Sequence, residues 1–469
     1  MTDVSKNNTV KISNAQDARR LYAFANTTDT GKIGLEVEMA LYKTNGTEIS
    51  IPTPGEMSDL QAKLRNKGFD AQLEAAGVLE YASPAVVIKD AAVLAERVRA
   101  DLAEFTQAAK EQGLTRAPYS ILPTTTRAEA FSKMASRERL VTSINAMLDI
   151  FPAPTVEIPL LTAGVQTSFS PKDEDQLFRM VYRAYALTPL LMAAMNSSSG
   201  FVGGDPARKD MLYRNSLYLG YGAAGGISPA FLKSSNGAEF IGNHIEAVFD
   251  APLHFAYGKE GALISASKEN PLTFRGLIAQ GLNTQSNYEL AESFLYNDVK
   301  ICNLRDKTGS VIGKRMEVRA ADSGQDQPVM AFLLTAALVP DGPVAAQFDT
   351  LLKEYGFTGD PKEDADLFVA ARNAAVNHNG KFMDVAFGTG NLLAFARDVA
   401  VLLSAQEKNL MQVPEAGRLL FILTTGSCDA AFFAAARPDF QAVKTDLLVT
   451  ASAPEKPLKT VIAAKTAKI

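Results

Sequence analysis

The sequence predicts an α+β protein in which helices pack on one face of an antiparallel sheet. Short segments alternate apolar and polar residues, as strands do, and long segments repeat apolar residues every three or four positions, as helices do. The two kinds of segment follow each other irregularly along the chain. A parallel sheet would need a regular succession of strands and helices, so the antiparallel arrangement is favoured.

Five segments can be assigned in chain order. A helix is expected over 84–112, because apolar residues recur on one face: Leu94, Val98, Leu102, Phe105 and Ala109. A second helix is expected over 173–195, where early acidic residues favour the helix dipole and Pro189 should kink or interrupt it. Residues 253–266 suit a β-hairpin that includes His254, 273–281 a short helix, and the Ala-rich stretch 362–436 several helices.

The composition is that of a folded globular chain. It has 469 residues, of which 47% are hydrophobic and 21% charged, with a formal net charge of −5. This mild acidity argues against nucleic acid as a partner. Two cysteines, Cys302 and Cys428, cannot form a disulfide framework, which suits a reducing compartment. No run of about 18 apolar residues suggests a membrane span. We therefore expect a cytoplasmic protein without a membrane partner.

The chain reads as one domain over residues 14–445, because it shows no internal repeat and no long linker. Its C-terminal part, from about residue 345, is expected to be helical. Residues 446–469 are rich in Lys, Ala and Pro without an apolar period, and we expect a flexible tail there.

The first functional signal is a pair of carboxylates on one predicted strand. Side chains in a strand point alternately to opposite faces, so Glu36 and Glu38 in the segment 33–39 share one face. Adjacent carboxylates repel each other and lose solvation when buried. A hard divalent cation such as Mg²⁺ or Mn²⁺ removes both penalties.

Two later segments follow the same logic. Gln166 and Ser168 share a face in the segment 163–169, and Glu317 and Arg319 share one in 314–324. A carboxylate beside a guanidinium suits a metal–phosphate centre, since arginine binds phosphoryl oxygens bidentately. Taken singly, each pattern is more common on a solvated strand face or in a surface salt pair. Three together favour one shared site.

A fourth segment, 72–84, contains two further acids. Glu74 and Glu80 lie on one face if the strand is unbroken, and Gly77 could place a bulge between them. The alternative, two acids of an edge strand in solvent, is equally common.

Taken in order, these segments resemble the glutamate–cysteine ligases of the plant and proteobacterial type. That family belongs to the carboxylate–amine ligases that share the glutamine synthetase fold, which implies a curved antiparallel sheet with helices on its outer face. The resemblance covers roughly residues 30–340 and is carried by these stretches: IGLEVEMAL, QLEAAGVLEYASP, TAGVQTSFS, FDAPLHFAYGKEGALISAS, TFRGLIAQGL and KRMEVRAADSG.

The resemblance implies roles for particular residues. Arg319 would stabilise the transferred phosphate, Arg214 would lie near substrate, and with Glu317 these would form the catalytic set. Asn196 and Ser197 would contact the nucleotide together with Arg319. The implied metal ligands are Glu36, Glu38, Glu74, Glu80, Gln166 and Glu317.

The activity that the resemblance implies is an ATP- and Mg²⁺-dependent joining of the γ-carboxylate of glutamate to the amine of cysteine through γ-glutamyl phosphate. This is the first step of glutathione biosynthesis. The loop LYLGYGAAGGISPA after Ser216 lacks the family's polar turn. That departure leaves two alternatives open: a ligase of the same fold for another amine or amino acid, or a non-catalytic relative that binds substrate or nucleotide. The oligomeric state stays open.

Overall fold

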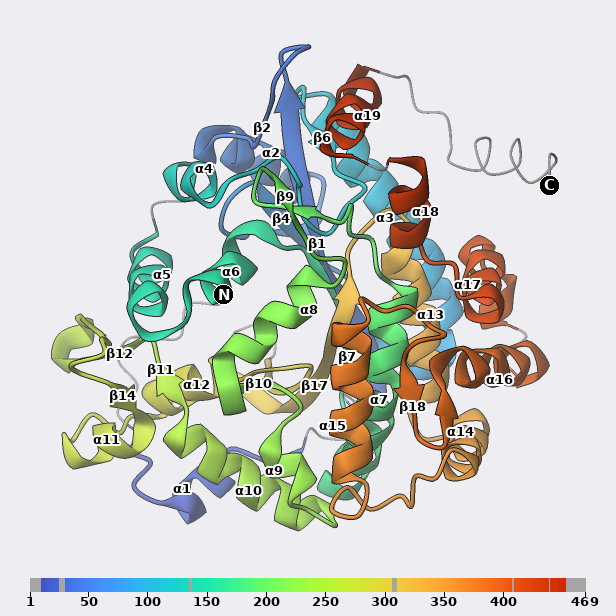
Figure 1. Cartoon of the computed structure of the whole chain (residues 1–469). Coiled ribbons are helices and arrows are strands. Elements are labelled where there is room, and N and C mark those ends of the chain that lie inside the picture. Colours follow the sequence, from blue (N-terminus) through green and yellow to red (C-terminus); the bar gives the residue numbers. More distant parts are fainter. Residues whose placement is uncertain are drawn as a thin grey trace.

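A curled sheet lies at the centre of the molecule, and helices surround it (Figure 1). The computed structural model describes residues 10–24, 30–134, 137–305, 310–406, 409–437 and 439–452. The sheet has the strand order β16-β17-β7-β1-β4-β3, and each neighbouring pair is antiparallel. This confirms the predicted mixture of helices and antiparallel sheet.

The main strands come from distant parts of the chain. They are β1 (Lys32–Thr44), β3 (Asp70–Leu73), β4 (Val78–Ala82), β7 (Gly164–Phe169), β16 (Val299–Arg305) and β17 (Val311–Asp322). Three short strands also pair with β1: β2 (Ile49–Ser50), β5 (Val86–Val87) and β6 (Thr115–Arg116). The remaining strands form two-stranded pairs: β8 (Phe201–Val202) with β9 (Asp205–Lys209), β10 (Gly225–Gly226) with β15 (Tyr296–Asn297), β11 (Pro252–Leu253) with β14 (Leu272–Thr273), β12 (Phe255–Tyr257) with β13 (Leu263–Ser265), and β18 (Ala386–Phe387) with β19 (Gly390–Asn391).

The helices connect these strands and extend the chain beyond them. Up to residue 250 they are α1 (Ala15–Arg19), α2 (Pro54–Asn66), α3 (Ala91–Lys110), α4 (Arg127–Ser132), α5 (Glu138–Ile150), α6 (Glu157–Leu161), α7 (Glu174–Ala194), α8 (Tyr213–Leu217), α9 (Pro229–Leu232) and α10 (Gly237–Asp250). After it they are α11 (Phe274–Ala279), α12 (Gln285–Ser293), α13 (Gln327–Leu338), α14 (Pro343–Glu354), α15 (Ala365–Asn377), α16 (Leu392–Gln406), α17 (Pro414–Thr425), α18 (Asp429–Ala436) and α19 (Phe440–Ser452).

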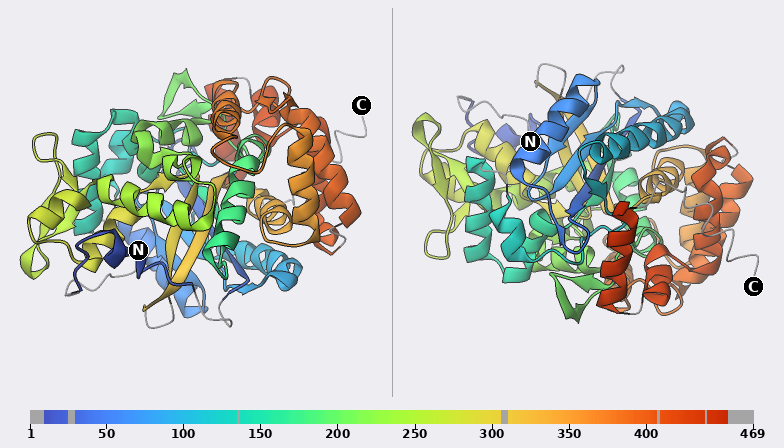
Figure 2. Two further views of the ribbon diagram at one scale, coloured as in Figure 1. Left: turned by 90° about the horizontal axis from the view of Figure 1, so that it is seen from below. Right: turned by 90° about the horizontal axis from the view of Figure 1, so that it is seen from above.

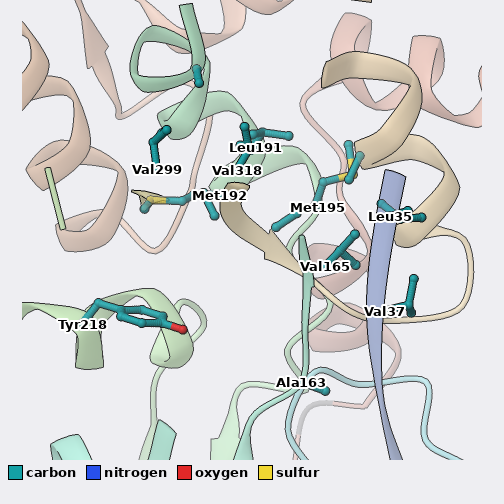
Figure 3. Packing of buried hydrophobic residues seen from close by; sticks show 14 of the residues in the cluster. Leu35, Val37, Ala163, Val165, Leu191, Met192, Met195, Tyr218, Val299 and Val318 are labelled. Atoms are coloured by element: carbon teal, nitrogen blue, oxygen red, sulfur yellow. The ribbon is translucent and has the colours of Figure 1, made fainter. Parts of the chain in front are cut away.

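One face of the sheet forms the apolar core. Val37 and Val165 pair directly across β1 and β7, and both are buried. Helices α7 and α13 pack against this face, and every residue of α13 is buried, as expected for a helix that is apolar all round. In Figure 3, Leu191 and Met192 from the end of α7, and Met195 just after it, lie near Val165 and Val318. The opposite face is therefore left for polar side chains.

Two predicted elements differ from the observed ones. The helix expected over 84–112 begins at Ala91, because Val86 and Val87 pair with β1 as strand β5. The segment 72–84 is not one strand but the hairpin β3–β4. Gly77, with φ of +67°, lies in its turn, a backbone conformation that glycine adopts without strain.

The other predicted elements are observed close to their expected bounds. Helix α7 runs through Pro189 without interruption, and β12 and β13 form the hairpin. The C-terminal part is mostly helical, and α14, α16 and α17 gather at one end of the molecule (Figure 2). Helix α19 extends past the expected boundary at 445, while residues 453–469 of the expected tail lie outside the described residues.

Among the described residues, no single helix is long and apolar enough to cross a membrane. Two sharply bent helix pairs, α13 with α14 and α17 with α18, reach that length and apolarity only when taken together.

His254 is buried between β11 and β12. Its Nδ1 lies 2.7 Å from the hydroxyl oxygen of Ser143, and its ring stacks on Phe294 with 4.1 Å between centroids. Its Nε2 is buried without a hydrogen-bond partner in the described structure. Burial lowers the pKa of His254 to about 3, so the ring is neutral in the folded protein at neutral pH.

This burial predicts a specific loss of stability in acid. The unfolded chain takes up a proton at His254 below about pH 6.5, whereas the folded protein does so only near pH 3. The contribution of His254 to the free energy of unfolding therefore falls as the pH is lowered from about 6.5 to about 3. It falls by up to about 1.4 kcal/mol per pH unit. His254→Phe keeps an aromatic ring that can stack on Phe294 and removes the titratable imidazole. We expect its urea-unfolding free energy to rise relative to wild type from about pH 8 to about pH 4.5, and a difference that does not change with pH would contradict this.

Candidate active site

The register of the central strands brings four of the predicted residues together. Glu36 on β1 pairs directly with Gln166 on β7, and Glu38 pairs with Glu80 on β4. Directly opposed side chains in an antiparallel pair lie on the same face. These four therefore share the sheet face opposite the apolar core, as the alternation of residues predicted.

Glu317 joins this group from β17. It pairs in register with Ser168 on β7 and is 3% exposed. Arg315 Nη2 lies 2.6 Å from its Oε1, and Arg319 Nη1 donates to its Oε2 over 2.9 Å. Burial alone would raise the pKa of Glu317, but the two guanidiniums more than offset this and hold it at about 2. Glu317 is therefore ionised, with both oxygens bound by arginine.

Arg315 is a site residue that the sequence analysis did not single out. Its Nη1 donates to Glu36 Oε1 over 2.8 Å and to the hydroxyl of Ser168 over 2.6 Å. It thus connects Glu36 on β1 with Glu317 on β17. The available signal was its spacing, because Arg315 lies two positions before Glu317 and so shares its strand face.

Gln166 links Arg319 to Glu38. Its Oε1 accepts from Arg319 Nη1 over 2.6 Å, and its Nε2 donates to Glu38 Oε1 over 3.1 Å. Glu38 Oε2 accepts the main-chain N–H of Gly164 over 2.6 Å. A chain of hydrogen bonds therefore crosses β17, β7 and β1.

The hairpin β3–β4 contributes Glu74 from its turn and Glu80 from β4. Burial is the main reason that their pKa values are raised, that of Glu74 to about 7 and that of Glu80 well above its usual range. Neighbouring carboxylates, Glu38 for Glu74 and Glu36 for Glu80, add to both shifts. Burial also raises the pKa of Glu38, although Arg214 and Arg319 oppose the shift. On this side of the site, burial and neighbouring carboxylates together disfavour the charged forms of the acids.

These side chains fit a hard divalent cation in donor type and in charge. All six candidates offer carboxylate or amide oxygens, which Mg²⁺ and Mn²⁺ prefer. In the described residues, however, no group of three or more His, Cys, Asp or Glu is arranged to hold a metal ion.

Arg214 lies next to the site but is bound to main chain. Strand β17 has a bulge between Val318 and Ala321, and Arg214 Nη1 donates to the carbonyl of Arg319 over 2.9 Å. Arg214 is 2% exposed, and a Cβ at Gly164 would overlap its guanidinium. The structure thus gives Arg214 a positioning role, because it fixes the backbone that carries Arg319. The substrate contact implied for it stays a prediction.

Asn196 and Ser197 lie apart from the carboxylates, after α7. Both are buried, and the main-chain N–H of Ser197 donates to Asp322 Oδ2 over 3.3 Å, at the far end of β17. In the described part of the chain, neither side chain hydrogen-bonds to a candidate metal ligand. Their contact with a nucleotide stays a prediction.

A group of tyrosines lies near Arg319. Tyr218 and Tyr221 lie in the 3-10 helix η3 (Tyr218–Ala224), and Tyr221 stacks on Tyr296 with 4.4 Å between centroids. Tyr221 is 4% exposed, and its hydroxyl has no hydrogen-bond partner in the described structure. The sequence analysis did not identify Tyr296, because nothing in its neighbourhood predicts that β15 pairs with the loop at β10.

Fold and site together define a mixed helix-and-sheet protein whose curled sheet carries buried and partly buried carboxylates and arginines on one face. The model of glutamate–cysteine ligase family 2 (GCS2) matches residues 32–379, a span that contains every candidate residue from Glu36 to Arg319. The chain belongs to this family, and the family implies a ligase. No curated protein matches the chain significantly.

The contact between Gly164 and Arg214 predicts the effect of one methyl group. Gly164→Ala should displace the buried guanidinium and lower the free energy of unfolding by about 1 to 3 kcal/mol. The matched control is Gly242→Ala within α10, where a Cβ meets open space and alanine favours the helix. Urea unfolding measures both. Equal stability of Gly164→Ala and wild type would show that Arg214 is not held against β7.

Proposed function

We propose that this protein is an ATP- and Mg²⁺-dependent ligase that joins the γ-carboxylate of glutamate to the amine of cysteine. In this proposal the fold is glutamine synthetase-like, the protein is cytoplasmic, and the reaction is the first step of glutathione biosynthesis. Family membership supports the ligase class. The observation that carries the proposal is the meeting of Glu36, Glu38, Glu80, Gln166 and Glu317 with Arg319 on one sheet face.

The reaction needs such a site because a carboxylate does not condense with an amine unaided. An oxygen of the γ-carboxylate attacks the γ-phosphorus of ATP, and ADP leaves. The amine nitrogen then attacks the carbonyl carbon of γ-glutamyl phosphate, phosphate leaves with the acyl C–O bond broken, and the amine loses a proton. Phosphoryl transfer spreads negative charge over oxygens, so catalysis is mainly positioning and electrostatic stabilisation.

The residues of this chain divide that work. Arg319 brings a fixed positive charge to the transferred phosphoryl group, and Arg214 holds the backbone on which Arg319 sits. When bound, Mg²⁺ or Mn²⁺ would neutralise phosphate charge. The proposed ligands are Glu36, Glu38, Glu74, Glu80, Gln166 and Glu317.

One observation favours a second candidate, a ligase for a different amine. The tyrosines of η3 and β15 stand beside Arg319, where the sequence departs from the family's polar turn. Stacked phenol rings suit an amine with a larger apolar group better than they suit cysteine.

A phosphate-release assay with ATP, Mg²⁺, glutamate and a panel of amines that includes cysteine tests the proposal. We expect release that depends on glutamate and is fastest with cysteine. If another amine is preferred, the second candidate holds. If no amine gives glutamate-dependent release, the protein is a binding relative and not a ligase.

The acidic side of the site can be tested separately. Glu80→Gln keeps the side-chain shape but removes the negative charge of one proposed metal ligand. We therefore expect kcat to fall by about 100-fold or more. Glu104→Gln on α3 is the matched control, because Glu104 only pairs with Lys67 on the surface. Normal turnover in Glu80→Gln would remove Glu80 from the site. Circular dichroism checks that both variants are folded.

A further inference from the structure

Arg315 lies where two carboxylates of the cluster face each other. It bridges Glu36 and Glu317 with N–O distances of 2.8 and 2.6 Å, and its side chain is only 25% exposed. Its third contact, to the hydroxyl of Ser168, is 2.6 Å long. The planar guanidinium can serve three acceptors at once, which a lysine ammonium on a flexible stem does less well. Arg315 is therefore held in place from β1, β7 and β17.

The cluster consequently has two unequal halves. In the arginine half, Glu36 and Glu317 are matched by the guanidiniums of Arg315 and Arg319. The acidic half holds Glu38, Glu74 and Glu80, and no described cationic side chain forms an ion pair with any of them.

The partners of the acidic half are neutral or distant. In the part of the chain that the structure describes, Glu38 accepts from the amide of Gln166 and the N–H of Gly164. Arg137 donates not to the carboxylate of Glu74 but to the main-chain carbonyl of Leu73, over 2.8 Å. The carboxyl groups that have no ion-pair partner among the described residues are thus concentrated in one half.

We propose that Arg315 is a resident counter-ion that takes the place of one divalent cation, so that cations bind only at the acidic half of the cluster. This inference rests on the proposed function, whose ligand set it narrows. Arg315 stands between Glu36 and Glu317 and occupies oxygens that would otherwise face an ion. Because it belongs to β17, this positive charge is present before ATP or any metal ion binds.

The consequence is a different count of bound ions, which Mn²⁺ titration measures directly. Electron paramagnetic resonance of free Mn²⁺ gives the number of ions bound per full-length chain. Arg315→Gln opens the arginine half, so this variant should bind about one more Mn²⁺ than wild type. Arg315→Lys keeps the charge and should bind the same number as wild type.

The matched control is Arg275→Gln. Arg275 also bridges two carboxylates, Glu246 and Asp250, but on the exposed surface. Its removal should leave the Mn²⁺ count unchanged, since exposed acids in water hold the ion weakly. If Arg275→Gln binds as many additional Mn²⁺ ions as Arg315→Gln does, the inference is overturned, because any pair of acids freed from its arginine would then bind Mn²⁺.

Folding of the variant gives a second readout. Removing Arg315 leaves Glu36 without its cation and the buried Glu317 with Arg319 alone, which destabilises the fold. If Arg315→Gln folds only when Mn²⁺ is present, Mn²⁺ supplies the missing charge and the inference holds. Failure to fold even with Mn²⁺ counts against it, because the ion then cannot replace the guanidinium.

The same titration separates this inference from the proposed function. If wild type binds Mn²⁺ and Arg315→Gln folds and binds the same number, only the counter-ion role of Arg315 is wrong. If neither protein binds Mn²⁺, the cation site of the proposed function is wrong, and the counter-ion role with it.

Discussion

The burial of like charges on one face of a sheet is the constraint on which the site depends. Carboxylates from β1, β4 and β17 converge there, and each loses hydration that something must replace. On one side the replacement comes from β17 itself, through Arg315 and Arg319. On the other side, in our proposal, a bound cation would supply it. The distribution of arginines along one strand therefore decides which carboxylates have a cationic partner within the described protein.

Support for that strand extends well beyond the sheet. The main-chain N–H of Arg319 donates to the carbonyl of Asp298 over 2.8 Å, and the carboxylate of Asp298 is bound by Arg372 on α15. On its other side, the bulge is held by Arg214. A β-bulge leaves main-chain groups outside the regular ladder, and here buried side chains and loops satisfy them. The bulge is thus a fixed part of the site and not a defect in the strand.

The sequence was sufficient to predict what depends on local pattern. Strand alternation placed Glu36 beside Glu38 and Glu317 beside Arg319, and helical spacing located α3 and α7. It was insufficient where distant segments decide the outcome. The hairpin β3–β4, the pairing of β10 with β15 and the bridging role of Arg315 all depend on which strands become neighbours. Arg214 shows the same limit, because its backbone acceptors exist only where β17 departs from regular pairing.

The long separation between partners also bears on how the protein is made. Arg315 stands 279 residues after Glu36, the carboxylate it binds. At ribosomal rates of about 5 to 20 residues per second, the acidic strand leaves the ribosome about 15 to 60 seconds before its partner. During that interval the emerging chain carries paired carboxylates whose mutual repulsion disfavours early collapse. Completion of the sheet, and with it of the site, has to wait for the strand that brings the arginines.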